Sequence, residues 1–159
     1  MDGTLCDVRT IRHFVEGRRR NFHAFHSASV SCPPYPEVLE VVEAARASGL
    51  AILVVTAREA RWSFHTALWL REHGIAYDEM LMRRTGDHRP DSAVKTQIAR
   101  RLVRRYDPVL AVDDRTEIIA VWHRFGISSR HVDDDGRVGP IVDPGLSPGG
   151  PEKDSSTGQ

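Results

Sequence analysis

The chain has 159 residues, of which 40% are hydrophobic and 28% charged, and its formal net charge is zero. This size and composition indicate a single globular domain and exclude an intrinsically disordered chain and a polycation. No apolar run reaches the length of a membrane span, the N-terminus lacks a signal-peptide pattern, and Cys6 and Cys32 are too few for a disulfide framework, so we expect a cytoplasmic protein.

The first third of the chain carries one clear helical pattern, which follows an irregular segment. Residues 5–36 show no regular period and end in a loop with three prolines, which remove backbone donors. From Glu37 onward apolar residues recur at helical spacing until Gly49, and the inward residues are Val38, Val41, Val42 and Ala45. Residues 50–55 form a continuous apolar run, which predicts a strand buried on both faces.

Helices and strands alternate in the rest of the chain. In order, we predict a helix over 60–73, a strand over 79–82, a polar loop over 85–90, a helix over 91–106, a buried strand over 108–112, a helix over 115–124 and a strand over 128–132. The inward residues of the first two of these helices are Phe64, Leu68, Trp69, Leu70, Val94, Ile98 and Leu102. Asp91 is the predicted N-cap of the helix that it begins. We expect one domain over 1–142 and a disordered tail over 143–159, which is rich in Gly, Pro and Ser.

This alternation predicts an α/β fold, a Rossmann-like parallel sheet with helices on both faces. In such sheets ligands bind beyond the carboxyl ends of the strands. Polar side chains follow two of the apolar runs: Thr56 and Arg58 come after residues 50–55, and Asp113 and Asp114 come after residues 108–112. Asp2 and Thr4 would follow a strand that precedes residue 1. Lys95, the one lysine before the tail, lies in the first turn of a predicted helix. We therefore expect these residues to form one site.

These residue types suit phosphoryl transfer. The adjacent carboxylates of Asp113 and Asp114 are hard oxygen ligands of the kind that Mg²⁺ prefers, and without a cation they would repel each other. Thr56 and strand-end amides can hold phosphate oxygens, while Lys95 offers a compact positive charge to the transferred group. One aspartate near phosphorus can act as a nucleophile, and a second carboxylate can protonate the leaving oxygen and then activate water.

Four stretches carry a family resemblance. Asp2-Gly3-Thr4-Leu5 matches the second half of an Asp-x-Asp-Gly-Thr motif; the others are Val54-Val55-Thr56-Ala57-Arg58, the pattern Gly-Asp-x-Arg-x-Asp-x-x-x-Lys over 86–95, and Asp113-Asp114-Arg115-Thr116 with the stretch 121–127. The chain thereby resembles the haloacid dehalogenase-like (HAD) phosphatases, and more closely the phosphatase domain of phage-type polynucleotide kinase/3′-phosphatase. The resemblance covers residues 2–127. The kinase half has no counterpart, because no Gly-x-x-x-x-Gly-Lys-Ser/Thr sequence occurs.

The resemblance implies a role for each matching residue. Asp2 would be the general acid/base, and its backbone carbonyl would also reach Mg²⁺. Asp113 and Asp114 would serve the metal directly or through water, while Thr56 and Lys95 would bind the phosphoryl group. The implied substrate contacts are Thr4, Arg58, Asp91 and one of the two arginines Arg9 and Arg12.

The nucleophilic aspartate of the motif would stand two residues before Asp2, and the printed chain begins at Met1. We therefore expect that the start is assigned too late or that the chain is trimmed. The preceding codons should then encode an apolar strand, central in the sheet, followed by aspartate. Without a central strand, ladder groups of its neighbours would stay unpaired. As written, the chain has no nucleophile for Asp2 to assist.

The resemblance implies an Mg²⁺-dependent phosphomonoesterase that acts through an aspartyl-phosphate on a phosphorylated substrate such as a nucleic-acid 3′ end. Predicted helices and strands fill much of the 54 positions from Asp2 to Thr56 and the 39 from Thr56 to Lys95, so we expect no large cap domain over the site. Two alternatives remain: a capless phosphatase for a small phosphate ester or phosphoprotein, and a non-catalytic relic that binds metal or phosphate.

Arginine supplies 20 of the 22 basic residues. The arginines at 18–20, 83–84, 89 and 100–105 could contact a phosphate backbone, although a solvated helix face is the favoured interpretation of the last cluster. We expect the tryptophans in the core rather than as stacking platforms: Trp62, Trp69 and Trp122. His23, His26 and Cys32 lack a fourth ligand at a spacing that would suit zinc.

Overall fold

The computed structural model describes residues 1–145 and has a mixed α/β fold, as the sequence predicts. The strands are β1 (Leu53–Glu59), β2 (Glu79–Arg83), β3 (Leu110–Asp113), β4 (Ser128–Val132) and β5 (Val138–Val142). The α-helices are α1 (Phe22–Ala28), α2 (Pro36–Ala47), α3 (Ser63–Glu72), α4 (Asp91–Leu102) and α5 (Thr116–Arg124), joined by the short 3-10 helices η1 (Arg9–Phe14), η2 (Ser29–Ser31) and η3 (Ala60–Trp62). No helix within residues 1–145 is long and apolar enough to cross a membrane.

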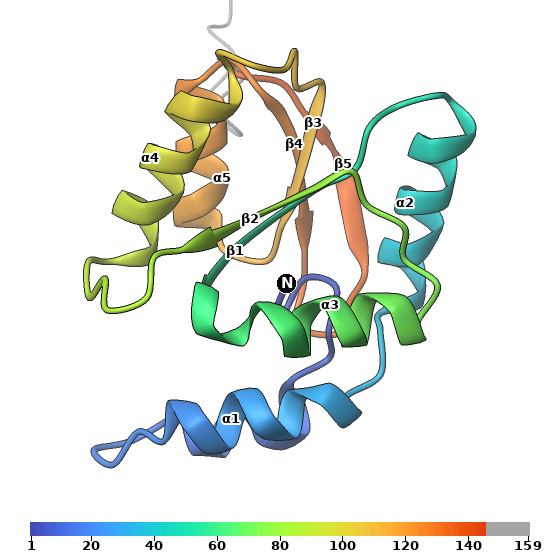
Figure 1. Cartoon of the computed structure of the whole chain (residues 1–159). Helices are drawn as coiled ribbons and strands as arrows, with labels where there is room; N and C mark the ends of the chain where they lie inside the picture. Colours follow the sequence, from blue (N-terminus) through green and yellow to red (C-terminus); the bar gives the residue numbers. More distant parts are fainter. Residues whose placement is uncertain (146–159) are drawn as a thin grey trace, which may run out of the picture.

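The strands form two separate hydrogen-bonded groups. β1 pairs with β2 in parallel, while β3 pairs with β4 in parallel and β4 with β5 antiparallel. Helices α4 and α5 lie together on one side of these strands and α2 lies on the other (Figure 1). Within the part of the chain that the structure describes, no ladder joins β1 to β3, so each of these strands has one edge without a strand partner.

Most of the predicted inward residues are buried. Val94, Ile98 and Leu102 of α4 are in the core, and so are the three tryptophans, which confirms their core assignment. Phe64 departs furthest from the prediction, because 73% of its surface is exposed. Helix α3 turns Thr66, Trp69 and Leu70 inward, and the helical repeat of 3.6 residues then places Phe64 on the opposite face.

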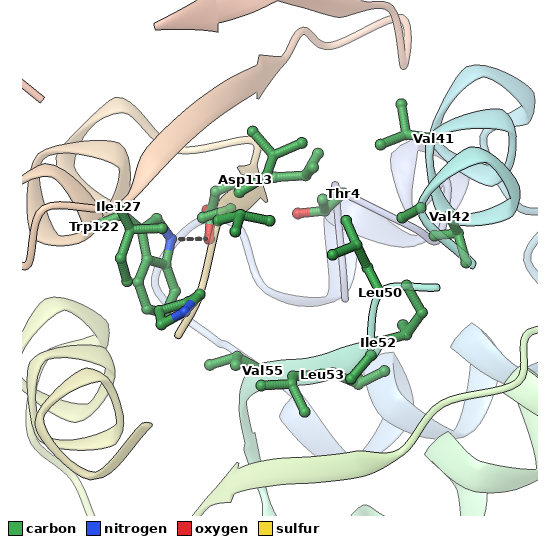
Figure 2. Close-up of a pocket in the computed structure, with 18 of the residues that line it drawn as sticks. Thr4, Val41, Val42, Leu50, Ile52, Leu53, Val55, Asp113, Trp122 and Ile127 are labelled. Carbon is green, nitrogen blue, oxygen red and sulfur yellow. Dashed lines mark hydrogen bonds between the residues drawn. The ribbon is translucent and has the colours of Figure 1, made fainter. Parts of the chain in front are cut away.

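Two strands begin later than the apolar runs predict. β1 starts at Leu53 and continues through Thr56 and Arg58, so these two residues lie within the strand rather than after it. The prediction that these runs are buried on both faces was also wrong near their first residues, because Leu50 is 41% exposed and Val109 is 55% exposed. Helix α2 shows the same departure, because only Val38 of its four predicted inward residues is buried. Leu50, Val109 and the four predicted inward residues of α2 all border one cleft between β1 and β3 (Figure 2).

Two elements escaped the sequence patterns. The hairpin from β4 to β5 turns at residues 133–137, where the Asp133 carboxylate accepts hydrogen bonds from the backbone N–H groups of Asp135 and Arg137, both at 2.9 Å. Pro140 is tolerated in β5 because this strand lies at the edge of its sheet. Helix α1 begins after Asn21, whose side chain caps the N–H of Ala24 at 2.9 Å. Disorder was predicted over 143–159; residues 146–159 lie outside the described part, and Asp143 accepts a hydrogen bond from Ser128 Oγ at 2.7 Å.

Candidate functional site

The first motif forms a tight turn that contacts the last one. The backbone N–H groups of Leu5 and Cys6 both donate to the carbonyl of Met1 at 2.9 Å, and Gly3 takes a φ of +76° within this turn. Thr4 is buried, and its Oγ1 donates to Asp114 Oδ1 at 2.6 Å. The structure therefore brings together two motifs that are 110 residues apart, as the sequence predicts.

Lys95 and Asp113 form a buried ion pair. Lys95 Nζ lies 2.6 Å from Asp113 Oδ2, and the two residues are only 7% and 3% exposed. Lys95 comes from the second turn of α4, and Asp113 is the last residue of β3. The same carboxylate accepts from the Trp122 indole N–H at 3.5 Å and from the backbone N–H of Arg115 at 3.3 Å. These contacts fix the ammonium group at the carboxyl end of β3.

Asp2 and Arg58 form a second pair in which the guanidinium donates to both carboxylate oxygens, with Nε 2.6 Å from Oδ2. Arg58 also donates to Ser29 Oγ at 2.8 Å and to Thr66 Oγ1 at 3.3 Å. Burial alone raises the pKa of Asp2, but the hydrogen bonds and charge of Arg58 outweigh it and hold this pKa below its ordinary value. The Asp2 carboxylate is therefore held ionised, which suits a proton acceptor better than a donor.

Thr56 is buried in β1, and its Oγ1 accepts a hydrogen bond from the backbone N–H of Arg58 at 3.1 Å. This bond ties the hydroxyl to the same strand segment that presents Arg58 to Asp2. The predicted phosphoryl-binding role of Thr56 stays a prediction, with its side chain at the same end of β1 as the Asp2–Arg58 pair.

Asp91 is not the N-cap of α4, which corrects the sequence prediction. Pro90 occupies the N-cap position and no side chain caps the helix, while Asp91 is the first helical residue. Its carboxylate instead accepts hydrogen bonds from two arginines, Arg83 and Arg115, the second at 2.6 Å. The Asp91 carboxylate thus binds two guanidinium groups, in addition to its favourable interaction with the helix dipole at the start of α4.

Arg83 is a residue that the sequence reasoning misassigned. Its guanidinium is buried and donates to the carbonyls of Ala57 at 2.7 Å, Asp87 at 2.9 Å and Arg89 at 2.6 Å, besides Asp91. These bonds leave the side chain no room to contact a phosphate backbone. They join the end of β1 to the loop before α4. No local sequence pattern signals this role, because its acceptors are mostly backbone carbonyls.

The two arginines after the first motif are exposed and paired with acidic residues elsewhere. Arg9 lies 2.7 Å from Asp7 and 3.0 Å from Asp135, and Arg12 lies 3.1 Å from Asp134. Within residues 1–145 neither is hydrogen-bonded to the residues that surround Lys95 and Asp2. The choice between them as a substrate contact stays open.

A model of the family described as the polynucleotide kinase PNKP phosphatase domain matches residues 1–136. The chain belongs to this family. Two similar solved structures are described as a Pnkp1/Rnl/Hen1 complex and as the Pnkp1/Rnl/Hen1 RNA repair complex. The first is 25% identical with a TM-score of 0.70, and the match covers 84% of this chain and 44% of that one. The second is 23% identical with a TM-score of 0.72, covering 84% and 40% respectively, and it supports the fold.

The chain thus spans less than half the length of these two solved chains. Family membership confirms the HAD-like phosphatase fold that the four sequence stretches predict. It also agrees with the contacts that join the first motif to the last and α4 to β3. The individual roles of the site residues remain predictions.

The predicted metal ligands suit Mg²⁺ in kind but are not assembled around one point. Within residues 1–145 no three His, Cys, Asp or Glu side chains gather closely enough to hold an ion. Asp2 is held by Arg58, Asp113 by Lys95 and Asp114 by Thr4. Since Mg²⁺ keeps several waters and needs only one or two carboxylates, Asp113 and Asp114 fit as its donors and the Asp2 side chain does not.

Replacing Gly3 with alanine should destabilise the protein by about 2–4 kcal/mol. A Cβ at Gly3 would lie 2.5 Å from Asp114 Oδ2, and the φ of +76° already disfavours a side chain. Gly86→Ala is the matched control, because its φ is +79° with nothing within 4 Å of the added carbon, and we expect about 1–2 kcal/mol there. Urea unfolding measures both, and equal losses would show that the turn does not press on Asp114.

His26 should make the protein sensitive to mild acid. Burial lowers the pKa of His26 to about 4, and its Nδ1 has no hydrogen-bond partner within residues 1–145. Above pH 6.5 the imidazole is neutral in both states; below it, the unfolded chain binds a proton that the folded chain rejects. The free energy of unfolding should therefore fall by about 2 kcal/mol between pH 7 and pH 5 from this group alone.

His26→Phe keeps the aromatic contact with Trp62, whose ring centroid lies 5.1 Å away, and removes the titrating group. Its unfolding free energy should lose about 2 kcal/mol less than the wild type between pH 7 and pH 5. His88→Asn removes an exposed imidazole and should follow the wild-type pH dependence. Identical pH profiles for His26→Phe and the wild type would contradict the prediction.

Proposed function

We propose that this chain is a phosphomonoesterase domain of the polynucleotide 3′-phosphatase type, and that its substrate is a phosphorylated nucleic-acid end. The observation that carries the proposal is the convergence of the first and last motifs through Thr4 and Asp114, beside the Lys95–Asp113 pair, in a member of the PNKP phosphatase family. An RNA repair complex among the solved relatives makes an RNA 3′ end the first substrate to test.

Each residue of the site has a proposed task. Lys95 holds the transferred phosphoryl group with Thr56, and its charge offsets the negative charge of the transition state. The nucleophile would be the aspartate expected two residues before Asp2. Its carboxylate forms a bond to phosphorus as the bond between phosphorus and the ribose 3′ oxygen breaks, and Asp2 gives that oxygen a proton. Asp2 then takes a proton from the water that hydrolyses the aspartyl-phosphate. A Mg²⁺ ion at Asp113 and Asp114 would neutralise phosphate oxygens.

The pairing of Asp2 with Arg58 bears on this assignment. An ionised carboxylate suits the second step, in which Asp2 accepts a proton from water. Proton donation in the first step requires a higher pKa, because an acid with a low pKa is deprotonated at neutral pH. We propose that the negative charge of a bound phosphoryl group competes for Arg58 and thereby frees Asp2 to carry a proton.

A non-catalytic phosphate-binding relic is the second candidate. Its support is that each of the three predicted metal ligands already has a partner: Arg58 for Asp2, Lys95 for Asp113 and Thr4 for Asp114. A relic of this kind would bind phosphate weakly and turn nothing over.

Phosphate release distinguishes the candidates. The chain should be assayed as printed and in a version extended by an apolar strand and aspartate directly before Met1, each with Mg²⁺ and a 3′-phosphorylated oligoribonucleotide. We expect turnover by the extended version, its loss with Asp113→Asn, and preference for the oligonucleotide over a 3′-mononucleotide. Preference for the mononucleotide would favour a small-ester phosphatase, and no turnover by either version would favour the relic.

A further inference from the structure

Aromatic side chains from α1 and from the η3–α3 segment form one continuous cluster. The Trp62 indole is at its centre, and the rings of His23, His26 and His65 lie 5.2, 5.1 and 5.0 Å from it between centroids. These contacts hold α1 and α3 side by side (Figure 1). The aromatic cluster comprises Phe22, His23, Phe25, His26, Trp62, Phe64 and His65.

The aromatic cluster is buried at its centre and open to solvent at its margins. Trp62 is 8% exposed, whereas Phe22 and Phe64 are 54% and 73% exposed. Within residues 1–145 no other phenylalanine, tyrosine or tryptophan is exposed. Each exposed ring contacts an imidazole, Phe22 that of His26 and Phe64 that of His65. The surface therefore offers aromatic faces that further flat rings can stack on.

Hydrogen bonds tie the aromatic cluster to the Arg58 guanidinium, which pairs with the first motif. Arg58 donates to Ser29 Oγ at 2.8 Å and to Thr66 Oγ1 at 3.3 Å. Ser29 Oγ donates onward to the carbonyl of His26 at 2.8 Å. Thr66 Oγ1 donates onward to the carbonyl of Trp62 at 3.0 Å. A ligand on the exposed rings would thus lie beside the carboxylate that Arg58 holds.

The charges around the exposed rings fit a polyanion. Arg18, Arg19 and Arg20 stand shortly before α1 and are all exposed. From residue 17 to residue 36 the chain contains no aspartate or glutamate, so nothing in this segment repels a phosphate. Aromatic faces beside cations are the combination with which proteins bind unpaired nucleic-acid strands, because bases stack on the rings while arginines follow the backbone.

We propose that the aromatic cluster binds unpaired nucleobases of a single-stranded nucleic acid next to its 3′ end, one base against Phe22 and another against Phe64. The inference rests on the proposed function, because the 3′-phosphate would then lie at Asp2 and Arg58, beside the cluster. The exposed imidazole of His23 can donate to or accept from a base edge. The surface thereby makes the terminal bases, and not the phosphate alone, contribute to substrate binding.

A single strand that ends in a 3′-hydroxyl tests the inference without any chemical step. The probe is a labelled oligoribonucleotide, its binding is followed by fluorescence anisotropy, and the protein is the chain as printed. The matched probe has the same backbone but carries abasic ribose at its last two positions. We expect the intact strand to bind at least about fivefold more tightly, because stacking on an aromatic side chain strengthens binding by about that factor or more per base.

Phe22→Ala and Phe64→Ala should each weaken binding of the intact strand at least about fivefold and leave binding of the abasic strand unchanged. Ile141→Ala is the matched control, because Ile141 is 60% exposed and belongs to β5, outside the aromatic cluster, and this variant should bind like the wild type. Unchanged affinity in either phenylalanine variant, or equal binding of the two strands, would overturn the proposal. Binding of neither strand would also overturn it and leave the exposed rings to a protein partner.

Photoreactive 5-iodouracil at the last two positions of the strand tests the location. It should crosslink to residues 22–26 or 62–65, and crosslinks confined to α4 would overturn the proposal. Base-dependent binding by a protein that releases no phosphate would leave this inference intact and count against the proposed function alone. Phosphate release at equal rates from intact and abasic 3′-phosphorylated strands would support the proposed function and overturn this inference.

Discussion

Lys95→Met should destabilise the protein by about 3–5 kcal/mol. Methionine matches the length of the lysine stem but leaves the carboxylate of Asp113, which is only 3% exposed, without its cation. Removing one partner of a buried ion pair is costly because the remaining charge stays away from water. Urea unfolding at neutral pH measures the loss, and binding of inorganic phosphate to the folded variant should weaken with it.

Arg105→Met is the matched control for Lys95→Met. Arg105 also donates to a carboxylate, Glu79, at 2.8 Å, but its side chain is 53% exposed, so we expect a loss far smaller than that of Lys95→Met. The double variant Lys95→Met with Asp113→Leu should lose less than the sum of its single changes, because no charge is left unpaired. Similar losses for Lys95→Met and Arg105→Met would contradict the buried pair.

The sequence predicted the site best for residues whose position follows from the direction of the parallel strands. Parallel strands bring their carboxyl ends to one edge, so Thr4, Asp113 and Lys95 could be placed together from the motifs alone. Arg83 could not, because its acceptors are carbonyls of a loop whose path depends on the finished fold. Asp91 looked like an N-cap because an aspartate at the start of a helix usually is one, and only the structure shows the two arginines beside it.

The fold shows the same division between local and non-local information. The helices α4 and α5 follow from spacing, while the extent of β1 does not, since the run of apolar residues ends before the strand does. Burial of that run was overestimated for a physical reason: a continuous apolar strand predicts cover on both sides, and within residues 1–145 the cleft side of β1 has no strand partner. The misjudged exposures of Leu50, Val109 and α2 thus share one origin.

Arg58→Met should destabilise the protein by about 3 kcal/mol. The Arg58 side chain is only 2% exposed and joins Asp2 to Ser29 and Thr66, so methionine leaves one carboxylate and two hydroxyls without their donor. Arg58→Lys keeps the charge but loses the planar fork that contacts both oxygens of Asp2, and we expect about half of that loss. Thermal or urea unfolding of the wild type, Arg58→Lys and Arg58→Met should show stability falling in that order.

Arg61 provides the comparison that isolates burial. It also pairs with a carboxylate two residues away, Glu59, but its side chain is 53% exposed, so Arg61→Met should cost at most about 1 kcal/mol. Asp2→Asn in the Arg58→Met background should recover part of the stability, because it removes the buried charge that the first change leaves unpaired. If Arg58→Met and Arg61→Met were equally mild, the Asp2–Arg58 pair would not be what ties the first motif to β1 and α3.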